Sequence, residues 1–128
     1  MTHVALRLLT TSTALAALCL ATAGAQAQSV RVRCESSPDR SKASVDGRDL
    51  APGRYRAVLT SGSHTAESPF DHTVDDEVEF DFDSNREDVQ DGATKIGRHF
   101  IVDNHVTGTL LDVDGNTVAM KKSECRQR

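Results

Sequence analysis

Residues 77–83, EVEFDFD, alternate strictly between acidic and apolar side chains. A period of two is the spacing of a β-strand with one buried face, because successive side chains of a strand point to opposite faces. A register shifted by one residue would bury a row of carboxylates, which costs far more than exposing an apolar side chain. The pattern therefore predicts a strand over residues 77–83. Its expected buried side chains are Val78, Phe80 and Phe82, and its expected exposed carboxylates include Asp81 and Asp83.

Alternation of the same kind recurs along most of the chain, and the three- and four-residue spacing of a helix is almost absent. The expected strands lie within residues 29–35, 42–50, 53–62 and 95–102 and within a final hairpin at 105–125. Asp46-Gly47 and Asp114-Gly115 are the residue pairs of tight hairpin turns. The candidate core includes Phe70, Val102, Val113, Val118 and Met120. Short alternating strands at close intervals predict an all-β fold, a small β-sandwich of about seven or eight strands.

Residues 50–55, LAPGRY, resemble the Leu-x-Pro-Gly-x-Tyr corner that leads into a strand in many immunoglobulin-like and prealbumin-like sandwiches. The resemblance implies an immunoglobulin-like or prealbumin-like β-sandwich. It covers six residues and implies no activity, because folds of this kind carry many unrelated functions.

Residues 1–27 have the composition of a secretory signal peptide. Arg7 precedes a charge-free apolar run, and Ala25-Gln26-Ala27 supplies a small-residue cleavage pattern. A retained membrane anchor is the alternative, but the run is too short to cross roughly 30 Å of hydrocarbon comfortably. We expect cleavage after Ala27, which would leave a single domain over residues 28–128, periplasmic or secreted and without a membrane span.

Two cysteines remain after the predicted cleavage, Cys34 and Cys125, because Cys19 lies within the leader. In an exported protein, two isolated thiols predict one disulfide, and neither a C-x-x-C motif nor a zinc-ligand set is present. The two residues fall in the first and last expected strands, so the bond should join the terminal strands. The chain-entropy model gives such a bond roughly 4 kcal/mol of stabilisation.

The charge of the chain is acidic and unevenly spread. Its 15 Lys and Arg stand against 19 Asp and Glu, and removing Arg7 with the leader makes the balance more acidic still. This argues against nucleic acid as a partner, since phosphate binding needs clustered positive charge. Residues 67–91 hold 11 acids and one arginine, between mildly basic flanks. Such a segment could attract cations or basic patches of a partner, although solvated strand faces explain the same charges.

The acidic segment also contains candidate metal ligands, which are Asp81, Asp83, Asn85, Glu87 and Asp88. Asp81-x-Asp83-x-Asn85 matches the first three ligand positions of an EF-hand, but Arg86 replaces the glycine of that loop and Gly92 replaces its final glutamate. A weak calcium site of another geometry remains an alternative if the following loop curls back toward Asp83. The simpler interpretation is that these acids keep an exposed strand soluble and unattractive to other strands.

No catalytic constellation stands out in the sequence. There is no G-x-S-x-G elbow, no Trp to stack on a sugar, and no free thiol once the disulfide forms. His64 and His72 could oppose each other across a hairpin as a surface metal pair. The sequence therefore predicts a non-enzymatic exported module that binds or supports a partner such as another exported or envelope protein. The alternative function is weak calcium binding by residues 67–91, with no other cofactor expected.

Overall fold

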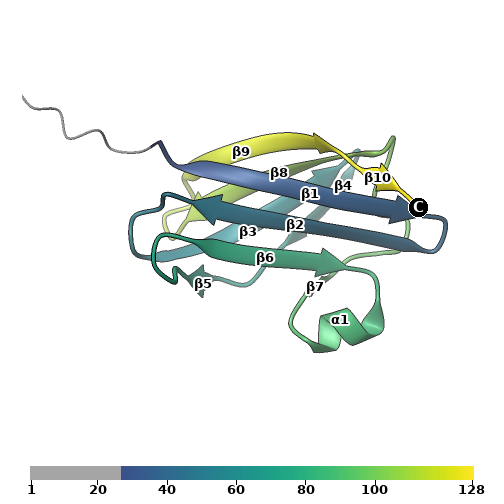
Figure 1. Ribbon diagram of the computed structural model, residues 1–128, viewed down its shortest axis with the longest axis horizontal. Helices are drawn as coiled ribbons and strands as arrows, with labels where there is room; N and C mark the ends of the chain where they lie inside the picture. Colours follow the sequence, from purple (N-terminus) through teal and green to yellow (C-terminus); the bar gives the residue numbers. More distant parts are fainter. Residues whose placement is uncertain (1–26) are drawn as a thin grey trace, which may run out of the picture.

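The computed structural model describes residues 27–128, so the predicted signal peptide lies outside the described residues except for Ala27. Within them the chain forms ten strands and one short helix (Figure 1). The elements are β1 (Ser29–Ser37), β2 (Arg40–Arg48), β3 (Arg54–Ser61), β4 (His64–Glu67), β5 (Asp71–His72), β6 (Val78–Asp83), α1 (Arg86–Gln90), β7 (Thr94–Lys95), β8 (His105–Asp112), β9 (Thr117–Glu124) and β10 (Arg126–Gln127).

The strands form two sheets. The first sheet has the order β10-β1-β2-β6-β7, and the second has the order β4-β3-β8-β9, with β5 also paired to β3. In Figure 1 the long strands of the first sheet lie in front of those of the second. The pairings are antiparallel except β1 with β10 and β6 with β7, which are parallel. The predicted all-β class is confirmed, although the strand number is higher than expected.

The core lies between the two sheets and receives alternate side chains of β1, β2, β3, β6 and β8, whereas β9 has no fully buried residue. Its buried members from the first sheet include Val32, Val45, Val78, Phe80 and Phe82, and those from the second include Tyr55, Ala57, Leu59, Val106 and Leu110. Gly108 of β8 makes a close approach possible, because a Cβ atom there would lie 2.6 Å from Cγ2 of Val32. Burial of each large apolar side chain contributes roughly 1.5–3 kcal/mol.

Strand β6 confirms the acidic–apolar alternation with one exception. Val78, Phe80 and Phe82 are buried and Asp81 is exposed, as expected. Asp83 was expected on the wet face but is only 1% exposed. It is the last residue of β6, where the chain turns into α1, and the side chain of Arg40 from β2 lies against it.

Three other local predictions are wrong. Asp46-Gly47 is no turn but part of β2, and the β1–β2 turn is at Pro38-Asp39. Residues 95–102 are mostly irregular: only Thr94–Lys95 pairs with β6, although Ile96 and Phe100 are buried. The helix α1, absent from the sequence prediction, begins because the Asn85 side chain accepts hydrogen bonds from the first N–H groups of the helix. The turn at Asp114-Gly115 is confirmed, with Gly115 at a φ of 81°.

Five expected core residues are not buried, and two of them, Val102 and Val118, are half-buried. Phe70 is also half-buried, Val113 is 58% exposed in the β8–β9 turn, and Met120 is 67% exposed. The register of β9 explains Met120. It pairs with Thr109, whereas Ala119 pairs with the buried Leu110, and a bulge shifts the pairing at the next residue of β8. A bulge exchanges the two faces of a strand, so a simple alternation fails across it.

Residues 50–55 form a corner that leads into β3, as their resemblance to the Leu-x-Pro-Gly-x-Tyr corner implies. The Tyr55 hydroxyl donates a hydrogen bond to the Ala51 carbonyl over 2.7 Å, and the Tyr55 ring is buried. This bond fixes the chain where it leaves the first sheet and enters β3 in the second.

The predicted disulfide between Cys34 and Cys125 is present, with Cα atoms 4.6 Å apart. Cys34 lies in β1, and Cys125 lies between β9 and β10, so the bond joins the first strand to the end of the chain. Because β1 also packs beside β9, this side of the molecule is closed. Among the residues that the structure describes, no helix has the length and apolar character needed to cross a membrane.

Candidate functional site: an acidic groove beside β6

Two of the predicted metal ligands, Asp83 and Asp88, bind the same arginine. The Arg40 guanidinium donates from Nε and Nη2 to the two carboxylate oxygens of Asp83, over 3.0 and 2.7 Å. Nη2 also donates to Oδ2 of Asp88 in α1, over 2.9 Å. The Asn85 N–H donates to Oδ1 of Asp83 over 2.9 Å. The cation that Asp83 and Asp88 bind is therefore the guanidinium group of Arg40.

The protonation of Asp83 follows from these contacts. Burial alone would raise the pKa of its carboxyl group, whereas the hydrogen bonds from Arg40 and from the Asn85 N–H lower it. The positive charges of Arg40 and Lys42 act in the same direction and hold the pKa of Asp83 below its ordinary value. Its bond to Asp83 also raises the pKa of Arg40. The pair is thus ionised at neutral pH.

The structure brings some of the five candidate calcium ligands together and leaves others apart. Asp83 and Asp88 share Arg40, and Oδ1 of Asn85 accepts from the N–H groups of Glu87 and Asp88 as the helix cap. Asp81 is exposed on β6 and accepts no hydrogen bond from the described residues. Within residues 27–128, no group of three or more His, Cys, Asp or Glu side chains is arranged to hold a metal ion.

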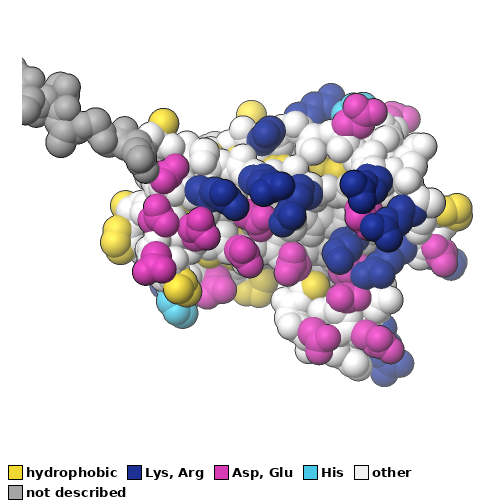
Figure 2. Space-filling view, in the orientation of Figure 1, with side chains coloured by type: hydrophobic (Ala, Val, Ile, Leu, Met, Phe, Trp, Pro, Cys, Tyr) yellow, Lys and Arg dark blue, Asp and Glu magenta, His cyan; other side chains and the backbone are white. Residues whose placement is uncertain are grey.

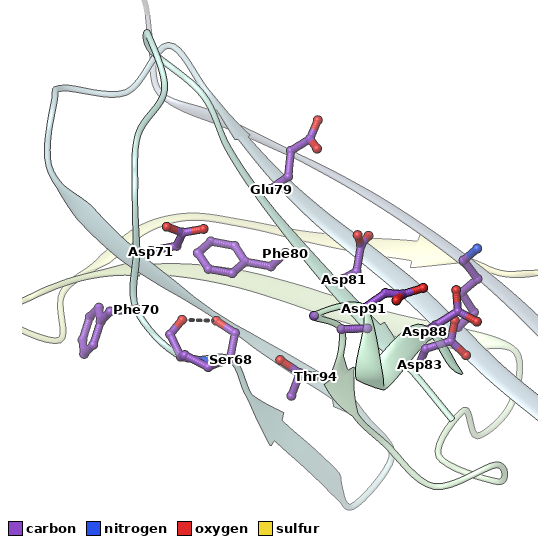
Figure 3. A pocket seen from close by; sticks show the side chains of 14 residues that line it. Ser68, Phe70, Asp71, Glu79, Phe80, Asp81, Asp83, Asp88, Asp91 and Thr94 are labelled. Carbon is purple, nitrogen blue, oxygen red and sulfur yellow. Dashed lines mark hydrogen bonds between the residues drawn. The ribbon is translucent and has the colours of Figure 1, made fainter. Parts of the chain in front are cut away.

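A groove of about 340 Å³ lies beside β6, between that strand, the β4–β5 connection and the α1–β7 segment. We call it the acidic groove. It is lined by Lys42, Ser68, Pro69, Phe70, Asp71, Glu79, Phe80, Asp81, Asp83, Asp88, Asp91, Gly92, Ala93 and Thr94. Figure 3 shows Asp81, Asp83, Asp88 and Asp91 at the end near α1, and Phe70, Phe80 and Ser68 at the other end. The groove therefore has an acidic end and an aromatic end.

The outer face of the first sheet continues the acidic surface. Glu79 stands opposite Asp46 on the neighbouring strand β2. Burial raises the pKa of Asp46, and the charges of Glu79 and Asp81 raise it further against the opposing effect of Arg33, whose Nη2 donates to Asp46 over 3.2 Å. In Figure 2, acidic side chains gather over β6 and α1, next to a band of basic side chains over β1. A negative potential therefore builds up along β6.

The aromatic end of the groove is held in place by arginines. Phe70 lies 4.0 Å from the guanidinium carbon of Arg56, measured to the ring centroid, and 5.6 Å from that of Arg54. Arg56 in turn donates to Glu67 over 3.2 Å. Cation–π contacts of this kind are favourable within about 6 Å. Phe70, expected in the core, is instead a half-buried aromatic wall of the groove.

One edge of β6 is open along the groove. Strand β7 is in register only with Phe82 and Asp83, and its pairing reaches no further than the Asp81 carbonyl, so residues 78–80 have no strand partner on that side among the described residues. The groove residues Glu79, Phe80 and Asp81 lie on this open edge.

The two histidines proposed as a metal pair are not opposed. His64 pairs with Ser61 at one end of β3, and His72 pairs with Arg54 at the other end. Nδ1 of His64 lies 2.7 Å from the Phe100 carbonyl oxygen. The hairpin that was expected to face them toward each other does not form.

Sequence reasoning missed the roles of Arg40, Lys42 and Phe70. Arg40 and Lys42 are more than 35 residues before the acids that they approach, and alternation within one strand carries no information on such a distant neighbour.

Comparison of the chain with protein-family models, with curated proteins and with solved structures finds no match.

Proposed function

We propose that this protein is an exported, non-enzymatic binding module that recognises a positively charged partner, another exported or envelope protein, through the acidic groove. The observation that carries the proposal is the lining of the groove. Glu79, Asp81, Asp71 and Asp91 contribute carboxylates there, and Lys42 contributes the one ammonium group. A concave surface of one charge sign attracts a partner of the opposite sign.

We also infer that the fold is an immunoglobulin-like or prealbumin-like β-sandwich. The Tyr55 corner and the core shared by two facing sheets support this inference. Export to the periplasm or the medium is supported by the signal-like residues 1–27 and by the disulfide, because disulfides persist in oxidising compartments. Binding modules of this size commonly use loops and strand edges of a rigid sheet framework.

A hexalysine peptide with blocked ends tests the charge recognition. We expect the exported protein to bind it in a calorimetric titration at low salt and to lose binding as salt rises, since exposed charges are screened. The variant Glu79→Gln/Asp81→Asn should bind roughly fivefold more weakly, as the loss of two exposed ion pairs of about 0.5 kcal/mol each predicts. The matched control Asp103→Asn/Asp114→Asn removes two exposed acids outside the groove and should bind as the parent does. Equal loss in both variants, or no binding at all, would contradict the proposal.

Weak calcium binding by residues 67–91 is the second candidate, supported by the exposed carboxylates of Glu79 and Asp81 in the groove. Calcium that binds the native state alone must raise the melting temperature by mass action. The discriminating measurement is the melting temperature with calcium and with EDTA. A calcium-dependent rise that disappears in Glu79→Gln/Asp81→Asn would favour the metal function. Against it stands Arg40, which already binds the carboxylates of Asp83 and Asp88.

A further inference from the structure

We propose that the partner binds as an extended segment that adds a strand to the open edge of β6 and carries Lys or Arg at every second position. This inference rests on the proposed function and names the form of its ligand. Three features support it, namely the direction of the backbone groups of β6, the alternation of its side chains and the shape of the acidic groove.

The backbone of β6 points unpaired groups into the groove. Ser84 donates its N–H to the Ser41 carbonyl over 3.0 Å, so this pair is a hydrogen-bonded pair of the antiparallel ladder with β2. Such pairs alternate with pairs whose backbone groups point away from the neighbouring strand. The N–H and C=O groups of Asp83, Asp81 and Glu79 therefore point away from β2.

Strand β7 uses both backbone groups of Asp83 and the carbonyl of Asp81, because the parallel bridge between Phe82 and Thr94 is made through the residues on either side of Phe82. Ile96 donates its N–H to the Asp83 carbonyl over 3.0 Å, which ends the parallel pairing of β7 with β6. The Asp81 N–H and both backbone groups of Glu79 have no strand beside them on that side among residues 27–128. A row of unpaired backbone groups is a template for another strand. The open stretch from Val78 to the Asp81 N–H is about 10 Å long at 3.3 Å per residue, which is enough for about three residues of a partner.

The side chains around the open edge define the chemistry of that partner. Glu79 and Asp81 point to the outer face of the first sheet, while Phe80 points to the other side, where Phe70 lies. An added strand has the same alternation. Cationic side chains on its outer face would lie beside Glu79 and Asp81, since opposite charges on neighbouring strands attract. Apolar side chains on its inner face would contact Phe70 and Phe80.

A second copy of this chain fits the groove less well. The whole chain has a net charge of −4, and the residues around the open edge belong to its most acidic segment. Like charges on neighbouring strands are destabilising, so the acids of β6 oppose pairing with the β6 of another copy. The same acids that exclude self-pairing select a basic partner.

The first test uses a blocked seven-residue peptide that alternates lysine and valine, added to the exported protein. Hydrogen exchange followed by NMR should show the amides of Glu79 and Asp81 becoming protected at least tenfold when the peptide binds. An alternating glutamate–valine peptide should neither bind nor protect them. Binding without protection of these two amides would show that charge alone holds the peptide and would overturn strand addition, while leaving the proposed function intact.

The second test uses two methylated forms of the lysine–valine peptide, one with methyl groups on the lysine backbone nitrogens and the other with methyl groups on the valine backbone nitrogens. A strand added at one edge uses the N–H groups of alternate residues only. We therefore expect one form to bind about tenfold more weakly and the other to bind as the parent peptide does, because each lost backbone hydrogen bond weakens binding. Equal binding of both forms would contradict strand addition.

A pair of protein variants separates the backbone contribution from the charge. Asp81→Asn and Asp81→Pro both remove one carboxylate, but only the proline variant also removes the outward N–H, which an edge strand tolerates. Asp81→Pro should bind the peptide more weakly than Asp81→Asn. If Asp81→Pro does not fold, binding of the methylated peptides to the parent protein tests strand addition instead. If no basic peptide binds and the protein instead sediments as a dimer that Asp81→Pro dissociates, a second copy occupies the edge, and both the inference and the proposed function are wrong.

Discussion

At the residue scale, the two buried carboxyl groups near β6 differ in how their negative charge affects the stability of the fold. Asp83 is buried and bound by Arg40 and by the Asn85 N–H, so its charge is stabilised. Asp46 is also buried, but Glu79 and Asp81 repel its charge, and the one arginine that binds it is mostly exposed. The two carboxyl groups therefore titrate in opposite directions from their ordinary values, which makes their contributions to stability separable by pH.

Asp83→Asn should lower the free energy of unfolding by about 2 kcal/mol at neutral pH, as the loss of hydrogen bonds to a charged group predicts. Asp81→Asn, at an exposed position of the same strand, should change it by no more than about 0.5 kcal/mol. Because the pKa of Asp83 is lowered, the stabilisation from its charge is complete above the ordinary carboxyl pKa and is lost as pH falls through the lowered value. Urea unfolding of the three proteins at neutral and acidic pH measures both effects. Equal losses in the two variants would contradict the assignment of Asp83 to the buried pair.

Asp46→Asn should have the opposite pH dependence. A raised pKa means that the folded state binds more protons than the unfolded state between the ordinary and the raised value. The charge on Asp46 therefore costs stability as pH rises through that window. We expect the variant to be more stable than the parent by about 0.5 kcal/mol at neutral pH, since the amide oxygen can still accept from Arg33, and equal to it at low pH. A variant less stable than the parent at neutral pH would show that the Arg33 contact outweighs the burial of the charge.

At the element scale, the sequence predicted the long strands and missed the short ones. The alternation around Phe80 and Tyr55 is clear because these strands bury one face along their whole length. Strands β5, β7 and β10 have two residues each, too few for any periodicity, and they form only because tertiary contacts bring them beside a longer strand. The Asp46-Gly47 pair misled the prediction because its turn preference is weaker than nine residues of pairing with β1.

The candidate site could be predicted only in part, for a related reason. The acids of β6 and α1 are visible in the sequence, but the carboxylates that Arg40 binds look the same there as those that remain free. The open edge of β6 depends on where β7 ends, and a two-residue strand leaves no signal in the sequence. The negative charge of this site was therefore predictable from the sequence. Which carboxylates bind Arg40, and which edge of β6 is open, were not.

The packing of strand β8 against the first sheet gives a further prediction. Gly108→Ala would bring a Cβ atom to 2.6 Å from Val32 and 2.9 Å from Val45, which are buried side chains of β1 and β2. We expect a loss of about 1–3 kcal/mol in the free energy of unfolding, the usual cost of overpacking a core. Gly97→Ala is the matched control, because a Cβ atom there meets nothing within 4 Å. Thermal unfolding of both variants measures the difference, and an unchanged Gly108→Ala protein would show that the two sheets can move apart at no cost.

At the scale of the whole molecule, the two sides of the paired sheets differ. One side is closed, where β1 packs beside β9 and the Cys34–Cys125 bond links them to β10. The other side carries the open edge of β6 and the acidic groove. An exposed strand edge is prone to unwanted pairing when the fold loosens. The disulfide holds the closed side of the molecule, away from this edge.

Replacement of both cysteines, Cys34→Ser with Cys125→Ser, should lower the free energy of unfolding by about 2–5 kcal/mol, as the loss of a native disulfide does in small secreted domains. The bond spans 91 residues, so its removal releases nearly the whole described chain in the unfolded state, where the entropy gain is largest. Urea unfolding of the parent with and without reductant, beside the double variant, measures the change, and the reduced parent should match the variant. Because the bond lies on the side away from the groove, binding of the lysine–valine peptide should be unchanged under conditions where the variant is folded. A folded variant that fails to bind the peptide would show that the disulfide shapes the groove across the width of both sheets, contrary to the division of the molecule into one closed and one open side.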